Sequence, residues 1–86
     1  MAGKGGTAME TVCLSDLKPG ESGLIVAMRL YGKQRRRLRD LGFLPGTAIR
    51  FVCWAPMGSP AAVHIKGSMF ALRKQTCRQI LVQRVA

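Results

Sequence analysis

The segment that decides the fold runs from Leu38 to Thr47 and reads LRDLGFLPGT. Gly42 stands directly after an arginine- and leucine-rich stretch, where the residue that ends a helix adopts a positive φ that glycine tolerates best. Phe43 follows at the position that packs back on Leu38, and Pro45 cannot continue a helix. Three separate signals therefore predict that a helix ends at Gly42.

The helix that ends there covers residues 33–41. At about 3.6 residues per turn, one of its sides faces the core. That side carries Leu30, Gln34, Leu38 and Leu41. The opposite side carries Arg35, Arg36 and Arg39, so the sequence predicts an amphipathic helix with a cationic outer face.

Short strands surround this helix. Five stretches are rich in β-branched residues or alternate between apolar and polar residues, and turn residues bound them. They are residues 24–30, 47–54, 61–66, 69–73 and 79–84. Residues 14–21 and 74–78 are short and polar, and they predict turns or single helical turns.

These strands predict a mainly β fold. An open sheet of this length would leave one face uncovered, so we expect a small, highly bent β-barrel of about five strands, with one short helix inserted after the first long strand. Its core combines inward-facing strand residues with two leucines of the helix. They are Ile49, Phe51, Val63, Ile65, Phe70, Leu72, Ile80, Val82, Leu38 and Leu41. Cys53 alternates with Phe51 and is expected to face inward as well.

Length and composition allow one domain. The chain has 86 residues, of which 48% are hydrophobic, and this excludes both a disordered tail and a separate cofactor domain. Residues 1–10 are small and glycine-rich and predict a flexible leader, so the domain covers residues 11–86. The longest apolar run, residues 24–28, is too short to insert stably into a membrane, and we expect a cytoplasmic protein.

Charge is distributed unevenly along the chain. The net charge is +10, and residues 1–31 contribute none of it because they hold three cations and three acidic residues. This asymmetry points to an anionic partner, which can be an acidic protein, a nucleic acid or a membrane surface. The densest cluster of cations is Lys33, Arg35, Arg36, Arg37 and Arg39.

The arginine cluster is the candidate binding site. Arg35 and Arg39 repel each other at the i, i+4 spacing, and only Asp40 offsets Arg36. A solvated helix face is the simpler interpretation, but the repulsion favours an acidic partner. Tyr31 and Trp54 could anchor an interface, although a barrel residue with one edge in water is the simpler role for each. The candidate partner-binding residues are Arg35, Arg36, Arg39, Lys33 and Trp54.

Two other classes compete with protein docking. A basic barrel suits contacts with RNA or DNA phosphates, but only 6% of the residues are aromatic, which leaves few stacking platforms. Catalysis is disfavoured because the four acidic residues form no evident pair and no Ser-His-acid set is suggested. We therefore expect a non-enzymatic protein.

The thiols and the histidine suggest no metal centre. Cys13, Cys53 and Cys77 are widely spaced, and His64 alternates with inward-facing residues of its strand. Buried or incidental thiols and a solvated histidine are the expected roles. We predict no cofactor, and a transition metal bound by His64 with a cysteine is the alternative.

Several motifs in the order of the chain together resemble the FeoA family, the small cytosolic component of bacterial ferrous iron transport. They are LSDLKPGESGLIV at 14–26, LRDLGFLPGT at 38–47, APMGSP at 55–60, and ALR at 71–73 before ILV at 80–82. The resemblance covers residues 13–85 and is most specific at the helix stop. Family members commonly carry Gly-Asp-Pro where this chain has Gly58-Ser59-Pro60, and a small apolar residue in place of Cys77.

The resemblance implies an SH3-like β-barrel with a short helix. It also implies a non-enzymatic accessory protein that docks on the cytoplasmic G-domain of the membrane iron permease FeoB, either with or without regulating it. The aspartate lost at Ser59 removes one carboxylate from the surface that could contact a partner or a metal. The arginine-rich helix is then expected to lie beside an acidic protein surface.

Overall fold

The helix stop at Gly42 forms as the sequence predicts. In the computed structural model, which describes residues 10–85, Gly42 has a φ of 108° in the left-handed region. Its N–H donates to the carbonyl of Arg39, and the N–H of Phe43 donates to the carbonyl of Leu38, both at 3.0 Å. These two bonds satisfy carbonyls left free at the helix end, and they terminate α1 (Gly32–Leu41).

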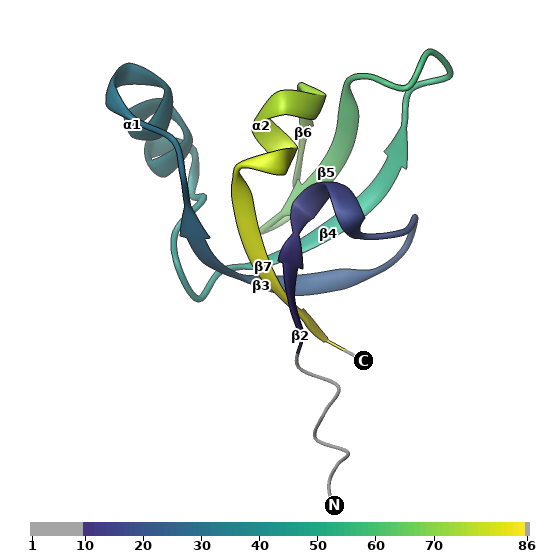
Figure 1. The fold of residues 1–86 in the computed structure, drawn as a ribbon, viewed down its shortest axis with the longest axis horizontal. Helices are drawn as coiled ribbons and strands as arrows, with labels where there is room; N and C mark the ends of the chain where they lie inside the picture. Colours follow the sequence, from purple (N-terminus) through teal and green to yellow (C-terminus); the bar gives the residue numbers. More distant parts are fainter. Residues whose placement is uncertain (1–9, 86) are drawn as a thin grey trace, which may run out of the picture.

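Within residues 10–85, six strands form one antiparallel sheet. They are β2 (Glu10–Cys13), β3 (Ser22–Met28), β4 (Ala48–Trp54), β5 (Ala61–Ile65), β6 (Ser68–Leu72) and β7 (Ile80–Val85). Their order in the sheet is β2-β7-β3-β4-β5-β6, so β2 and β6 are its edges. Figure 1 shows the sheet strongly bent around its concave face, with α1 standing to one side of it. The predicted mainly β fold, with a helix after the first long strand, is confirmed.

Two short helical turns lie near each other at one end of the sheet. They are η1 (Leu14–Asp16) and α2 (Lys74–Arg78), the two polar segments for which the sequence predicts single turns. The Asp16 carboxylate accepts the N–H of Cys13 at 3.2 Å and so caps η1. No helix within residues 10–85 is long and apolar enough to cross a bilayer.

Strand β2 is absent from the sequence-based prediction. It pairs with β7, with Val12 opposite Val82, and it starts at Glu10, which the prediction assigned to the leader. An ion pair of 2.8 Å between Glu10 and Arg84 accompanies this pairing. Four residues are too few to show a clear alternation, so only their partner strand reveals them. Residues 1–9 of the predicted leader, like residue 86, lie outside the described residues.

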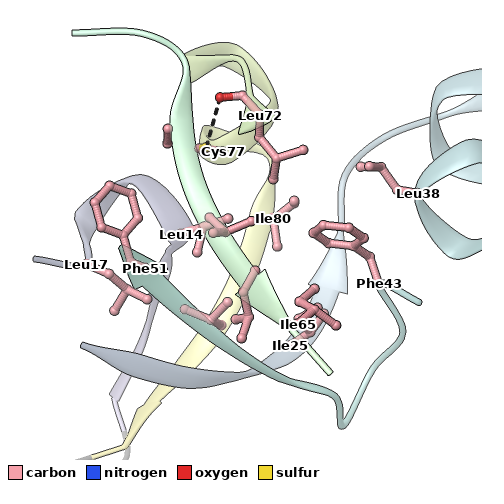
Figure 2. Packing of buried hydrophobic residues seen from close by; sticks show 14 of the residues in the cluster. Leu14, Leu17, Ile25, Leu38, Phe43, Phe51, Ile65, Leu72, Cys77 and Ile80 are labelled. Atoms are coloured by element: carbon pink, nitrogen blue, oxygen red, sulfur yellow. Dashed lines mark hydrogen bonds between the residues drawn. The ribbon is translucent and has the colours of Figure 1, made fainter. Parts of the chain in front are cut away.

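The core lies on the concave side of the sheet. Figure 2 shows Phe51, Leu14, Ile80, Ile65 and Phe43 converging from different elements. Seven of the eight predicted core positions on strands are buried, as is Leu38 on α1. The core also includes residues absent from that set, namely Leu14, Leu17, Ile25, Leu30, Phe43, Ala61 and Cys77.

Two predicted core residues are less buried than expected. Leu41 is 45% exposed, whereas Phe43 just beyond the helix is fully buried and Leu38 is the only buried residue of α1. Phe70 is half-buried at the edge strand β6, where its ring meets that of Phe43 edge-on at 5.4 Å between centroids. The prediction that Leu41 is a core residue was therefore wrong.

Cys53 is exposed, which corrects the prediction that it faces inward. The register between β4 and β5 shifts between Phe51 and Cys53, as in a β-bulge. Such a bulge reverses the alternation of the residues that follow it. Trp54 consequently turns toward Phe51, and their ring centroids lie 5.2 Å apart.

Candidate functional site

The outer side of α1 brings three predicted site residues together. Arg35, Arg36 and Arg39, which we call the arginine face, are exposed and line one open hollow of about 520 Å³. Gly32, Asp40 and Leu44 complete its lining. The helical repeat places the three arginines on the same side of α1, as the sequence predicts.

No ion pair within residues 10–85 neutralises the arginine face. Among residues 10–85, the ion pairs of the structure involve Arg84 with Glu10 and Glu21, and none involves α1. Asp40 lines the same hollow without forming an ion pair there. The like charges of Arg35 and Arg39 are one turn apart, so the folded chain carries an unrelieved repulsion at this surface.

Apolar side chains border the arginine face. A second hollow, of about 330 Å³, is shared by Arg35, Arg39 and Leu44, and β3 contributes Val26 to it. Val26 and Leu44 are both exposed. Arginine beside exposed apolar groups is typical of protein interfaces and less so of a surface that contacts only water.

Sequence reasoning missed these apolar neighbours. Leu44 follows the helix stop, where its orientation depends on the turn, and Val26 belongs to a run that reads as wholly buried. The register of β3 against β7 shifts between Ile25 and Ala27, and Val26 lies at that irregularity. An unbroken apolar run beside a bulge carries no local signal of which residue turns outward.

The other two predicted site residues lie apart from this hollow. Lys33 is exposed on α1 but lines neither hollow. Trp54 is at the far end of β4, where it packs on Phe51 and lies 6.0 Å from the Lys74 ammonium. The aromatic residue at the start of α1 is instead Tyr31, which is 82% exposed. Binding roles for Lys33 and Trp54 remain predictions.

The candidate metal ligands do not assemble. Among the described residues, no three His, Cys, Asp or Glu side chains are close enough to hold a metal ion together. Cys13 is partly buried, Cys53 is exposed and Cys77 is buried, and they lie on β2, β4 and α2. The absence of a cofactor remains a prediction.

Cys77 is the most enclosed thiol. It is fully buried, and its Sγ donates to the Leu72 carbonyl over 3.9 Å, the contact drawn in Figure 2. Burial raises the pKa of the Cys77 thiol to about 11, because the apolar surroundings disfavour the thiolate. The thiol is neutral at physiological pH, and its role is to fill the core.

We expect this raised pKa to make stability fall at alkaline pH. Between about pH 9 and 11 the thiol of Cys77 loses its proton in the unfolded chain but keeps it in the folded chain. The free energy of unfolding therefore falls by roughly 2 kcal/mol over this range. Below about pH 9 the stabilisation is fully present. Urea unfolding at several pH values checks this, with Cys77→Ala as control. If the stability difference between the two proteins stays constant up to pH 11, the thiol is not shielded as described.

The bent antiparallel sheet and the short cationic helix define the class of this protein, a small SH3-like domain with an exposed arginine-rich surface. Within that class the chain belongs to the FeoA family, since the family model described as the FeoA domain matches residues 12–84. The predicted family is thereby confirmed.

Known proteins similar to this chain include a curated relative and solved structures. The relative is an Fe(2+) transport protein A/Fe(2+) transporter FeoB fusion protein of Porphyromonas gingivalis, 30% identical over 73 residues, which are 85% of this chain and 9% of that protein. The chain thus spans about a tenth of that relative.

Two solved structures carry the likeness in three dimensions. The FeoA protein of Chlorobium tepidum is 31% identical with a TM-score of 0.83, over 87% of this chain and 71% of that one. The Stenotrophomonas maltophilia FeoA complexed with zinc, described as a procaryotic SH3 domain protein, is 32% identical with a TM-score of 0.71, over 83% and 88%. The predicted SH3-like fold is confirmed.

Proposed function

We propose that this chain is a non-enzymatic, cytoplasmic component of bacterial ferrous iron transport that docks on the G-domain of a FeoB-type permease through its arginine face. The observation that carries the proposal is the convergence of Arg35, Arg36 and Arg39 in one open hollow, without a recorded ion pair among residues 10–85. An acidic surface on the partner would relieve their repulsion and gain from complementary charge.

Family membership and the fused relative support the choice of partner. In the Porphyromonas gingivalis protein, segments named for Fe(2+) transport protein A and for the transporter FeoB share one chain. Fusion holds two modules at high effective concentration, which favours contacts between them. Ferrous iron transport is therefore the process in which we expect this chain to act.

A binding role accounts for the acidic residues better than catalysis does. Asp16 caps η1, the Glu21 carboxylate accepts the N–H of Lys18 at 2.7 Å, and Glu10 pairs with Arg84. Three of the four carboxylates of the chain are thus engaged in structural contacts. Asp40 remains, and among residues 10–85 no second carboxylate lines its hollow to form an acid–base pair with it.

Charge reversal tests the proposal. We expect the triple variant Arg35→Glu, Arg36→Glu and Arg39→Glu to keep the fold and to weaken binding to the purified permease G-domain at least roughly tenfold. The loss should appear mainly as slower association, and the salt dependence of binding should largely disappear. Surface plasmon resonance at two salt concentrations measures both effects.

The matched control is the triple variant Arg29→Glu, Arg50→Glu and Arg78→Glu. These residues are exposed and lie outside α1, and their replacement changes the net charge by the same amount as the first variant does. Binding should stay within about threefold of the native chain. Equal losses of affinity in both variants would mean that only the overall charge of the chain matters. Unchanged binding of the variant at Arg35, Arg36 and Arg39 would mean that the arginine face is not part of the interface.

Nucleic-acid binding is the competing function, since the chain carries a net charge of +10. The same variants separate it from protein docking. If the arginine face binds phosphates, its reversal should flatten the dependence of log affinity for RNA or DNA on log salt and leave the G-domain interaction unchanged.

A further inference from the structure

Strand β6 has one free side within residues 10–85. There it pairs with β5 alone, since it is the last strand of the described sheet. The turn between them consists of Lys66 and Gly67, whose φ values of 48° and 83° are typical of a two-residue hairpin. In such a hairpin the flanking residues, here Ile65 and Ser68, exchange the first pair of main-chain hydrogen bonds.

This register identifies the unpaired main-chain groups. Bonded pairs alternate along an antiparallel ladder, so Phe70 and Leu72 also bond toward β5. The N–H and carbonyl groups of Met69 and Ala71 consequently point away from the sheet. An edge strand with such groups can accept a further strand.

A groove of about 390 Å³ follows this free edge. Residues 70–73 all line it, although successive side chains of a strand point to opposite faces. Three consecutive residues of β6 and the Arg73 that follows them therefore indicate that the hollow runs along the edge of the strand. The opposite wall is α1, which stands apart from the sheet on this side in Figure 1.

The groove is apolar along its middle and cationic at its rims. Leu41 of α1 and Phe70 of β6 are only partly covered, and both line it. Arg37 and Arg73 are exposed at the two walls, and neither has a recorded ion pair within residues 10–85. At the α2 end of the groove, the Gln34 amide donates to the Thr76 hydroxyl over 3.2 Å and links α1 to α2.

We propose that this groove binds an extended protein segment that adds to β6 as a seventh strand and alternates apolar with acidic residues. Main-chain bonds form with Met69 and Ala71, as in other cases of strand addition. The apolar side chains of the segment cover Leu41 and Phe70, and its carboxylates pair with Arg37 and Arg73. Positive charge on both walls selects the acidic residues.

A second copy of this chain fits the groove poorly. Residues 68–72 contain no acidic residue, and each copy carries a net charge of +10, so two β6 edges would repel. The groove also uses none of the three arginines of the arginine face. This site is independent of the function proposed above, and one can fail without the other.

The test uses the isotope-labelled full chain and a blocked hexapeptide of alternating glutamate and valine. We expect binding tighter than about 1 mM, with amide shifts and slowed hydrogen exchange at Met69 and Ala71. The same peptide N-methylated on alternate residues, which cannot bond to a strand edge, should bind at least roughly tenfold more weakly. NMR titration measures each of these changes.

Charge variants test the rims of the groove. Arg37→Glu with Arg73→Glu should weaken binding of the hexapeptide roughly tenfold, while the matched pair Arg29→Glu with Arg78→Glu should change it less than about threefold. Four results would overturn the proposal: no binding at about 1 mM, equal binding of the N-methylated peptide, shifts confined to the arginine face, or self-association through β6 without peptide.

Discussion

Replacing Phe51 by alanine is expected to lower the free energy of unfolding by about 3–5 kcal/mol, a large part of what a domain of this size possesses. Phe51 is fully buried on β4 and contacts Trp54 edge-on. Its removal leaves a cavity at the centre of the sheet, because β4 is held on both sides by β3 and β5. Urea unfolding followed by circular dichroism measures the loss.

Two controls make this result specific. Met57→Ala, at an exposed position, should change stability by less than about 0.5 kcal/mol. Phe70→Ala should cost less than Phe51→Ala, because its side chain is only partly buried. A loss under about 1 kcal/mol for Phe51→Ala would contradict the register of β4 against its neighbours.

The helix stop could be predicted residue by residue because its causes are local. Gly42, Phe43 and Leu38 take their roles from positions along one chain segment, and the two hydrogen bonds that they form need no other element. The hairpin between β5 and β6 is local in the same sense, since Lys66 and Gly67 alone close it.

The errors occur where a distant strand decides the outcome. Cys53 turns outward because the register of β4 against β5 shifts by one residue. The sequence of residues 48–54 alone does not indicate this shift. Strand β2 exists because β7 offers it an edge. Leu41 is an error of another kind, since helical periodicity does not show that Phe43 and not Leu41 is the buried residue at the helix end.

The candidate site divides in the same way. Helical periodicity predicts that Arg35, Arg36 and Arg39 converge, and they line one hollow. Val26 and Leu44 join that surface only through tertiary structure. The groove beside β6 was beyond sequence reasoning, since the order of strands determines which one is the edge.

Gly42→Val is expected to lower the free energy of unfolding by about 3 kcal/mol, because a β-branched residue is strained at a φ of 108°. Space is not the limit, since a Cβ at this position would meet only the Ile65 side chain, at 4.0 Å. The cost therefore arises in the backbone. Relief of the strain would break the bonds to Leu38 and Arg39 and unwind the end of α1, which carries part of the arginine face.

Asparagine is the matched control for this position, because it tolerates the left-handed region better than other residues with a Cβ. Gly42→Asn should cost less than about 1.5 kcal/mol, and it should keep the affinity for the permease G-domain that Gly42→Val loses. Denaturant unfolding and helical circular dichroism compare the two variants. Equal stabilities of the two variants would mean that the helix end does not depend on a positive φ. If Gly42→Asn is the more stable variant and also binds the G-domain more tightly, then Gly42 supports both the fold and the binding surface.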